Sequence, residues 1–324
     1  MLLTRRSALR ATVGGIALAG LGRLSANSAL AAPTPALPGP GFFRFNVGRL
    51  EVTAISDGFI PVTADEMAQN VGNAAAGPAG VAINAPTDKN VIPFTTLVVN
   101  TGSKLVLLDA GNGDICAPTS GTWMENFKAA GFSPDKVDAV LISHFHGDHI
   151  NGLRLKDGTT VFPKAEIMVP VAEWSFWMDM SRMASVPEEV RGTFLNARRV
   201  FGPMTSQVRL LDWGKEPITG ITTVAAPGHT PGHTAFAIAS GNANLLVLSD
   251  TTNNPQMMLR NPDAASAFDM DSDMAQQSRR RLLDMAATDR LQTAFYHAPF
   301  PATGLITKDG DRFRMVSTGT PSAT

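Results

Sequence analysis

One stretch of the sequence sets the expected fold: His144-Phe145-His146-Gly147-Asp148-His149. It holds three of the six histidines of the 324-residue chain. The other three lie in Pro227-Gly228-His229-Thr230-Pro231-Gly232-His233 and at the end of Phe295-Tyr296-His297. Neutral imidazole is a common ligand of zinc and similar ions. Histidines confined to three short segments therefore indicate one metal centre.

The clusters follow segments that have the composition of β-strands. Residues 137–143 lead into His144, 221–226 precede His229, 245–249 precede Asp250, and 291–297 end at His297. Residues i and i+2 of an extended chain point to the same side, so His144 and His146 can reach one ion. A turn at Gly147 then lets Asp148 and His149 face a second position. Strand ends that meet at one edge would bring all of these side chains together.

The remaining pattern predicts a mixed α/β chain. Further strands are expected at 42–56, 94–100, 104–109, 208–213, 234–239 and 313–317, with Asp57-Gly58 as a turn after the first. Helices are expected at 123–130, 171–183, 187–201 and about 273–288, the last with Asp271 or Ser272 as its N-cap. Residues 64–90 predict a long loop that could cap a pocket or contact a second subunit in a homodimer. Strands interrupted by helices without regular alternation favour a two-sheet core with helices outside.

The motifs and their order resemble the metallo-β-lactamase fold superfamily. The supporting residues are His144-x-His146-x-Asp148-His149, Asp109-Ala-Gly111 after a strand, Gly228-His229-Thr230, Asp250 after Leu-Val-Leu-Ser, and the late His297. Within that superfamily the sequence resembles the methyl parathion hydrolases over most of residues 32–324. Segments that carry this likeness are 51–58, 99–107, 226–233, Met270-Asp-Ser-Asp273 and the stretch that follows His297.

The resemblance implies an αββα sandwich of two mixed β-sheets flanked by helices, with a dinuclear metal centre. One ion would be bound by His144, His146 and His229, and the other by Asp148, His149 and His297. Asp250 would bridge the two ions and position a hydroxide, and Asp148 is a second candidate catalytic residue. In the family pattern the first histidine of the Gly-His-Thr-Pro-Gly-His loop, here His229, is the metal ligand. His233 is therefore expected to hold a ligand in place rather than bind metal, and the carboxylate of Asp109 is expected to do the same.

The substrate pocket departs from that of the parathion hydrolases, which is lined by aromatic rings. Trp177 and Phe194 match two of those rings, although both lie in helical segments and plain core packing is the alternative. Cys116 falls where a third ring, a phenylalanine, is expected. N-acyl homoserine lactonases of the superfamily carry a tyrosine three residues after the bridging aspartate, where this chain has Asn253. The predicted pocket residues are therefore Cys116, Trp177, Phe194 and Asn253.

These observations predict a metal-dependent hydrolase of aryl esters, lactones or organophosphate triesters. The alternatives are an N-acyl homoserine lactonase and an iron-dependent oxidoreductase of the same fold. Two divalent ions are expected. Zinc is the first candidate, and imidazole and carboxylate ligands also accept manganese, cobalt or iron. A metal can lower the pKa of bound water to about 7 and polarise a carbonyl or phosphoryl oxygen, so no serine or cysteine nucleophile is required.

The N-terminal residues 1–31 are predicted to be a twin-arginine export signal. Arg5-Arg6 is followed by an apolar run from Ala11 to Leu21, too short to span a bilayer, and by the small-residue cleavage site Ala29-Leu30-Ala31. Residues 32–324 would then form the hydrolase domain in the periplasm or outside the cell.

Removing the signal takes away four of 27 basic residues and none of 28 acidic ones, for a net charge of 23 − 28 = −5. The absence of a basic stripe predicts that nucleic acid is not a partner, and the single cysteine excludes an internal disulfide.

Replacing Arg5 and Arg6 by lysine should abolish export, because the twin-arginine route reads this pair. The route carries folded proteins, so metal would be loaded before export. Fractionation of cells that express the native and the double-lysine chain measures the effect. Undiminished export of the variant would contradict the prediction.

Overall fold

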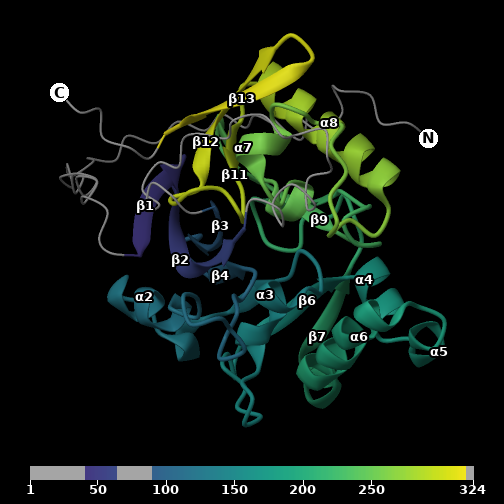
Figure 1. The fold of residues 1–324 in the computed structure, drawn as a ribbon. Helices are drawn as coiled ribbons and strands as arrows, with labels where there is room; N and C mark the ends of the chain where they lie inside the picture. Colours follow the sequence, from purple (N-terminus) through teal and green to yellow (C-terminus); the bar gives the residue numbers. More distant parts are fainter. Residues whose placement is uncertain (1–40, 64–89, 319–324) are drawn as a thin grey trace, which may run out of the picture. The chain divides into compact units, whose positions relative to one another are not determined.

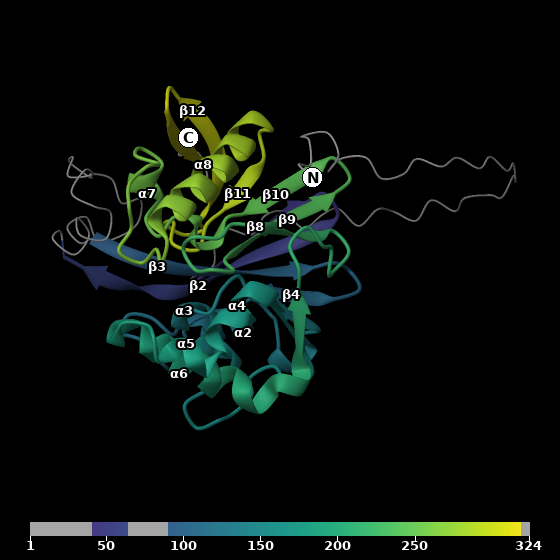
Figure 2. The same ribbon diagram turned by 90° about the vertical axis from the view of Figure 1, so that its right-hand side faces the viewer.

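A computed structural model describes residues 41–63 and 90–318 of the chain. The predicted export signal, its cleavage site and nearly all of the predicted 64–90 loop lie outside these residues. Within them two β-sheets lie face to face between two layers of helices (Figures 1 and 2). This arrangement confirms the predicted αββα sandwich. None of the described helices combines the length and the apolar character needed to cross a membrane.

The first sheet is mixed and has seven strands among the described residues. Neighbours pair antiparallel from β1 to β4 and parallel from β4 to β7, and the spatial order follows the chain. The strands are β1 (Phe42–Val47), β2 (Leu50–Val62), β3 (Asn90–Asn100), β4 (Leu105–Leu108), β5 (Ala139–Leu141), β6 (Glu166–Pro170) and β7 (Val208–Leu211).

The second sheet has six strands in the described part of the chain. Only β10 and β11 pair parallel. The strands are β8 (Ile221–Ala225), β9 (Thr234–Ser240), β10 (Ala243–Val247), β11 (Gln292–Ala294), β12 (Thr303–Asp309) and β13 (Arg312–Ser317).

Helices cover the outer face of each sheet. In Figure 2, α7 and α8 lie on one side of the two sheets and α2 to α6 on the other. Their bounds are α2 (Trp123–Ala129), α3 (Gly147–Ile150), α4 (Val171–Trp177), α5 (Met180–Met183), α6 (Glu188–Phe201), α7 (Pro255–Met258) and α8 (Ser272–Thr288). Short 3-10 turns occupy Pro134–Lys136, Asn151–Leu153, Gly202–Gln207 and Ser249–Thr251.

Alternation along the strands builds the three layers of core. Leu97 and Val99 of β3 point between the sheets, and Val98 points towards the helices. Phe236 of β9 meets the first sheet in the shared interior. On the far side, Leu282 of α8 packs against the second sheet. Because side chains alternate with a period of two, each central strand supplies two layers at once.

Some predicted elements differ from the structure. The strand predicted at 42–56 is two paired strands, and Asp57-Gly58 lies at a β-bulge inside β2 rather than at its end. The helix predicted at 171–183 is divided into α4 and α5, since Asp179 caps a new helix that begins at Met180 and accepts the Ser181 N–H at 2.9 Å. Strands β6 and β12 were not expected. The first is a short apolar run between prolines, and the second has mostly exposed polar residues after Leu305.

Candidate metal centre

The ends of five strands deliver polar side chains to one edge of the sandwich. Strand β5 is followed by His144, β8 by His229, β10 by Asp250 and β11 by His297, while β4 ends one residue before Asp109. Asp271, the N-cap of α8, accepts a hydrogen bond from the Met274 N–H at 3.0 Å. Its own N–H donates to the Gly228 carbonyl at 2.9 Å, which holds the start of the helix beside this edge. The predicted site residues on these strand ends are thus brought together by the fold.

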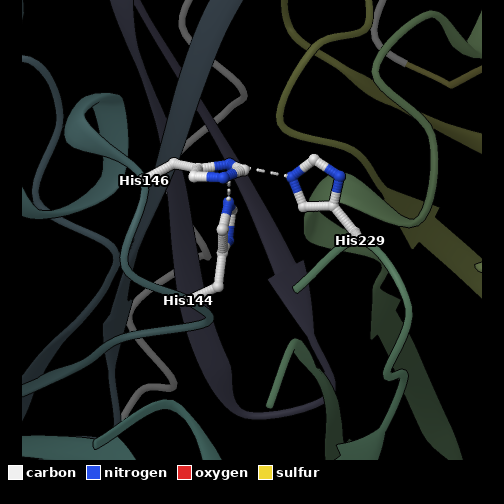
Figure 3. Close-up of side chains that lie close together, drawn as sticks. All are labelled: His144, His146 and His229. Atoms are coloured by element: carbon white, nitrogen blue, oxygen red, sulfur yellow. Dashed lines mark hydrogen bonds between the residues drawn. The ribbon is translucent and has the colours of Figure 1, made fainter. Parts of the chain in front are cut away.

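Three histidines form the first group, which is shown in Figure 3. The Nδ1 atom of His146 lies 3.0 Å from the Nε2 atom of His144 and 3.0 Å from the Nε2 atom of His229. One imidazole nitrogen carries at most one proton, so it cannot donate to both neighbours. Nitrogens that share a zinc ion at about 2.0–2.1 Å lie roughly 3–3.4 Å apart at tetrahedral or somewhat smaller angles. The spacing therefore fits three ligands of one ion.

The second group consists of Asp148, His149, Asp250 and His297, whose ligand atoms all lie within 4.8 Å of one another. The Nε2 atom of His149 is 3.3 Å from carboxylate oxygens of both Asp148 and Asp250. His149 Nε2 and Asp250 Oδ1 are buried without a hydrogen-bond partner. Unsatisfied buried polar atoms that face one point are costly unless a cation fills it, so this group also fits a metal ion.

Asp250 lies between the two groups. Its Oδ2 atom is 2.9 Å from His297 Nε2, 3.5 Å from His229 Nε2 and 3.9 Å from His144 Nε2. Its Oδ1 atom is the one that faces His149. A carboxylate placed this way can contribute to both positions, as the resemblance implies for a bridging ligand.

In four of the five ligand rings, those of His144, His149, His229 and His297, the far nitrogen is held by another polar group, which favours one tautomer of the ring. His149 Nδ1 donates to Asp109 Oδ2 at 2.9 Å, His229 Nδ1 donates to Asp269 Oδ1 at 3.0 Å, and His297 Nδ1 donates to the Pro93 carbonyl at 2.9 Å. The hydroxyl of Ser143 donates to Asp109, so it accepts from His144 Nδ1 at 3.0 Å. In its neutral form, each of these four rings turns an unprotonated Nε2 towards the centre, which is the form that binds a cation.

The electrostatics of the two groups differ. Burial lowers the pKa of His146 to about 3 and holds that of His144 well below its ordinary value, so both rings are neutral at pH 7. Burial alone would also lower the pKa of His149 and of His297. The carboxylates of Asp148 and Asp250 outweigh it and raise both pKa values. The second group therefore attracts positive charge, which a metal ion can supply in place of protons.

Asp109 and His233 act behind the ligands, and neither belongs to either group. Asp109 has a positive φ of 64° and accepts the Ser143 N–H at 2.7 Å in addition to His149. His233 donates from Nδ1 to the Ala226 carbonyl at 2.9 Å and accepts the Asp250 N–H on Nε2 at 3.1 Å. Burial lowers the pKa of His233 to about 3, which keeps Nε2 free to accept. His233 thus holds the backbone of the central aspartate.

Glu173 at the start of α4 was not predicted from the sequence. Its buried carboxylate accepts the Phe145 N–H at 2.9 Å, the Gly232 N–H at 2.7 Å and the Trp177 indole at 2.8 Å. It therefore joins the 144–149 segment to the 229–233 loop. The loop approaches so closely that a Cβ at Gly232 would lie 2.3 Å from the Glu173 nitrogen, and one at Gly228 would lie 2.1 Å from the nitrogen of Ala275 in α8.

A cavity of about 340 Å³ opens over both groups. Its lining residues are Ile60, Ile92, Phe94, Asn112, Ile115, His146, Gly147, Asp148, Asn151, His229, Asp250, Asn253, Phe268 and His297. Of the four predicted pocket residues, Asn253 lines this cavity. Trp177 and Phe194 do not: their rings are 1% and 0% exposed and pack together in the core beneath the site, with centroids 4.8 Å apart. Cys116 is exposed beside the wall residue Ile115 rather than in the wall itself.

The sequence model of the metallo-beta-lactamase superfamily matches residues 90–291, which is more than half of the chain. The chain belongs to the metallo-beta-lactamase superfamily. Among solved structures, it is similar to AidC, described as a dizinc quorum-quenching lactonase. That likeness has 25% identity and a TM-score of 0.76, over 87% of this chain and 99% of that one.

Two curated relatives match shorter parts of this superfamily chain. The N-acyl homoserine lactonase AttM of Agrobacterium fabrum is 23% identical over 183 residues, which is 49% of this chain and 64% of AttM. Ribonuclease Z of Pyrococcus furiosus is 32% identical over 68 residues, which is 21% of this chain and 19% of the enzyme. The chain thus spans less than two thirds of the length of either relative.

Replacing Asp250 by alanine should remove the group that faces both positions. We expect zinc content to fall from two ions to less than one per chain, measured by elemental analysis after dialysis. His233→Ala is the comparison, because it removes only the acceptor for the Asp250 N–H, an interaction worth about 1–3 kcal/mol when a buried partner is left unpaired. It should retain a substantial fraction of zinc and activity. Full zinc binding by Asp250→Ala would refute the shared role.

Zinc binding should release protons and strengthen as the pH rises. The raised pKa values of His149 and His297 mean that the metal-free protein gains stability from their protons below about pH 6.5, and loses it as the pH rises through the raised values. An ion must displace these protons, so affinity should rise between about tenfold and 100-fold per pH unit for one or two protons. Calorimetric zinc titrations in two buffers of different ionisation enthalpy count the protons. Zero release at pH 7 would contradict the assignment.

Proposed function

We propose that this protein is a dinuclear metal-dependent hydrolase that opens the lactone ring of N-acyl homoserine lactones. The observation that carries the proposal is the position of Asp250 between two ligand groups at the base of an apolar-walled cavity. The likeness to AidC and AttM, both described as lactonases, supports this substrate class.

Imidazole and carboxylate donors are suited to zinc, and they would hold two divalent ions in the two groups. When bound, such ions would supply Lewis acidity at a substrate carbonyl and lower the pKa of water to about 7. The cavity wall contains no serine, cysteine or lysine among the described residues. Water is therefore the nucleophile that this site can use.

Asp148 is the carboxylate best placed to move a proton. Its side chain lines the cavity and is 21% exposed, whereas that of Asp250 is 3% exposed. Hydrolysis takes a proton from the attacking water, and ring opening leaves an alkoxide that needs one. The Asp148 carboxylate at the cavity surface can accept the first proton and return it to the alkoxide. Tyr296, the chain's single tyrosine, is otherwise engaged, because its hydroxyl donates to the Asp148 carbonyl and burial raises its pKa well above the ordinary value. It therefore positions Asp148.

The apolar part of the wall suits an acyl chain. Ile60, Ile92, Phe94, Ile115 and Phe268 line the cavity beside the polar groups of the centre. Each methylene buried there would contribute about 0.8 kcal/mol. A substrate with a carbonyl at one end and an alkyl chain at the other matches this division of the wall.

Aryl esters and phosphotriesters are the second candidate class, since the same centre could polarise a phosphoryl oxygen. The resemblance to the parathion hydrolases supported this class through two aromatic residues expected in the pocket wall, Trp177 and Phe194. Both lie in the core instead. Iron-dependent oxidoreductases with a single iron do not use a full second ligand group, whereas this chain assembles one. The first observation removes part of the support for phosphotriesters, and the second favours a dinuclear hydrolase over a single-iron oxidoreductase.

The zinc-loaded chain should hydrolyse N-hexanoyl homoserine lactone with a kcat/KM at least about tenfold above that for an aryl acetate or a dialkyl aryl phosphotriester, a difference of about 1.4 kcal/mol in barrier. The three substrates are compared at one pH and one zinc concentration. Asp250→Ala serves as the control for contaminating activity. A higher kcat/KM for the phosphotriester would place the protein in the second class.

A further inference from the structure

Arg279 of α8 is a buried arginine behind the centre and does not line the cavity. Its side chain is 1% exposed, and it uses four of its five N–H donors. Nε donates to the Thr251 carbonyl at 2.9 Å. Nη1 donates to the carbonyls of Pro262 and Ala264 at 2.9 and 2.8 Å. Burial of a guanidinium costs free energy unless hydrogen-bond acceptors are fixed around it. Arg279 has such acceptors on all sides that its donors use.

The fourth donor of Arg279 reaches the centre through one carboxylate. Nη2 lies 3.2 Å from Asp269 Oδ2, and Asp269 Oδ1 accepts the Nδ1 proton of His229 at 3.0 Å. The Asp269 side chain is 3% exposed. The two oxygens of one buried carboxylate thus face an arginine on one side and a ligand histidine on the other.

The backbone reinforces this connection. The Met270 N–H donates to the His229 carbonyl at 3.1 Å, and the Asp271 N–H donates to the Gly228 carbonyl at 2.9 Å. His229 is therefore held to the start of α8 at its ring and on its main chain. Because Thr251 follows Asp250, Arg279 also holds the turn that carries the central aspartate.

The two carboxylates behind the ligand histidines differ in their surroundings. Asp109, behind His149, accepts from Ser143 and forms an ion pair with His149 only, among the described residues. Asp269, behind His229, is also paired with an arginine. The Arg279 pair offsets the charge of Asp269 while it fixes the direction of both oxygens. Its effect on His229 is therefore chiefly orientation.

We propose that Asp269 and Arg279 are positioning residues for the metal centre: Asp269 fixes the His229 ring, and Arg279 holds Asp269 and the Asp250 turn in register. The inference rests on the proposed dinuclear centre. It predicts unequal effects at the two positions. Loss of the Asp269 charge should weaken the three-histidine position alone, whereas loss of the Arg279 fork should weaken both, because Asp250 is shared.

Three variants of the full chain test this inference. Asp269→Asn keeps the shape and the acceptor for His229, Arg279→Lys keeps the charge but loses the planar fork, and Arg280→Lys is the control on the next residue of α8, whose side chain is 38% exposed. Zinc affinity at each position is measured by competition with a chelator. Cobalt absorption spectra and a His229→Ala reference identify which ion is affected.

Asp269→Asn should lower zinc affinity at the position lost in His229→Ala by about 10- to 100-fold and leave the other position unchanged. Arg279→Lys should lower both, and Arg280→Lys neither. Wild-type affinity at both positions in Asp269→Asn would overturn the inference, even if Arg279→Lys fails to fold. Equal weakening at both positions in Asp269→Asn would overturn it as well. A wild-type chain that binds no divalent ion would instead remove the proposed function on which the inference rests.

Discussion

The orientation of the ligands by polar groups behind them is the constraint on which the site depends. His149 is held by Asp109, His229 by Asp269, His297 by the Pro93 carbonyl, and the backbone of Asp250 by His233. The ligands come from segments up to 153 residues apart, His144 to His297. Sub-ångström placement of such groups requires that their rotamers be locked by neighbours, and here the strand ends and their supporting hydrogen bonds provide that lock.

The sandwich supplies the rigidity that these supports need. Each sheet has an apolar layer on both faces, so the strand ends are fixed by packing on two sides. Glu173 and Arg279 then connect the ligand segments to the helices outside the sheets, one on each side of the sandwich. The centre is consequently braced by both helical layers.

Much of the fold and the convergence of the centre could be predicted from the sequence, because strand periodicity and histidine spacing are local signals. The buried carboxylates of Glu173 and Asp269 could not be, since an acidic residue in a helix or loop is ordinarily exposed and nothing nearby in the sequence shows its distant partner. The Asp57 turn was misplaced for the same reason. Its carboxylate accepts hydrogen bonds from Asn112 and Trp123, which lie 55 and 66 residues away.

The pocket wall was the least predictable part. Trp177 and Phe194 are aromatic, as residues of a substrate pocket often are, but α4 and α6 turn them into the core. Their position in a helix does not by itself show whether a side chain faces the pocket or the core. Their burial also shows why resemblance transfers a metal centre more readily than a specificity: the ligands are fixed by strand ends, whereas the wall depends on how surrounding segments pack.

The glycines of the 228–233 loop carry a consequence for how this motif is read in other sequences. Gly228 abuts the nitrogen of Ala275, and Gly232 abuts the nitrogen of Glu173, at distances that leave no space for a methyl group. Neither glycine touches the place where substrate would lie, as the cavity lining shows. Selection on both positions would therefore act through the close approach of α4 and α8, whatever bond the enzyme cleaves. A Gly-His-Thr-Pro-Gly-His signature accordingly marks an architecture, and the chemistry of each bearer has to be read from the residues around its cavity.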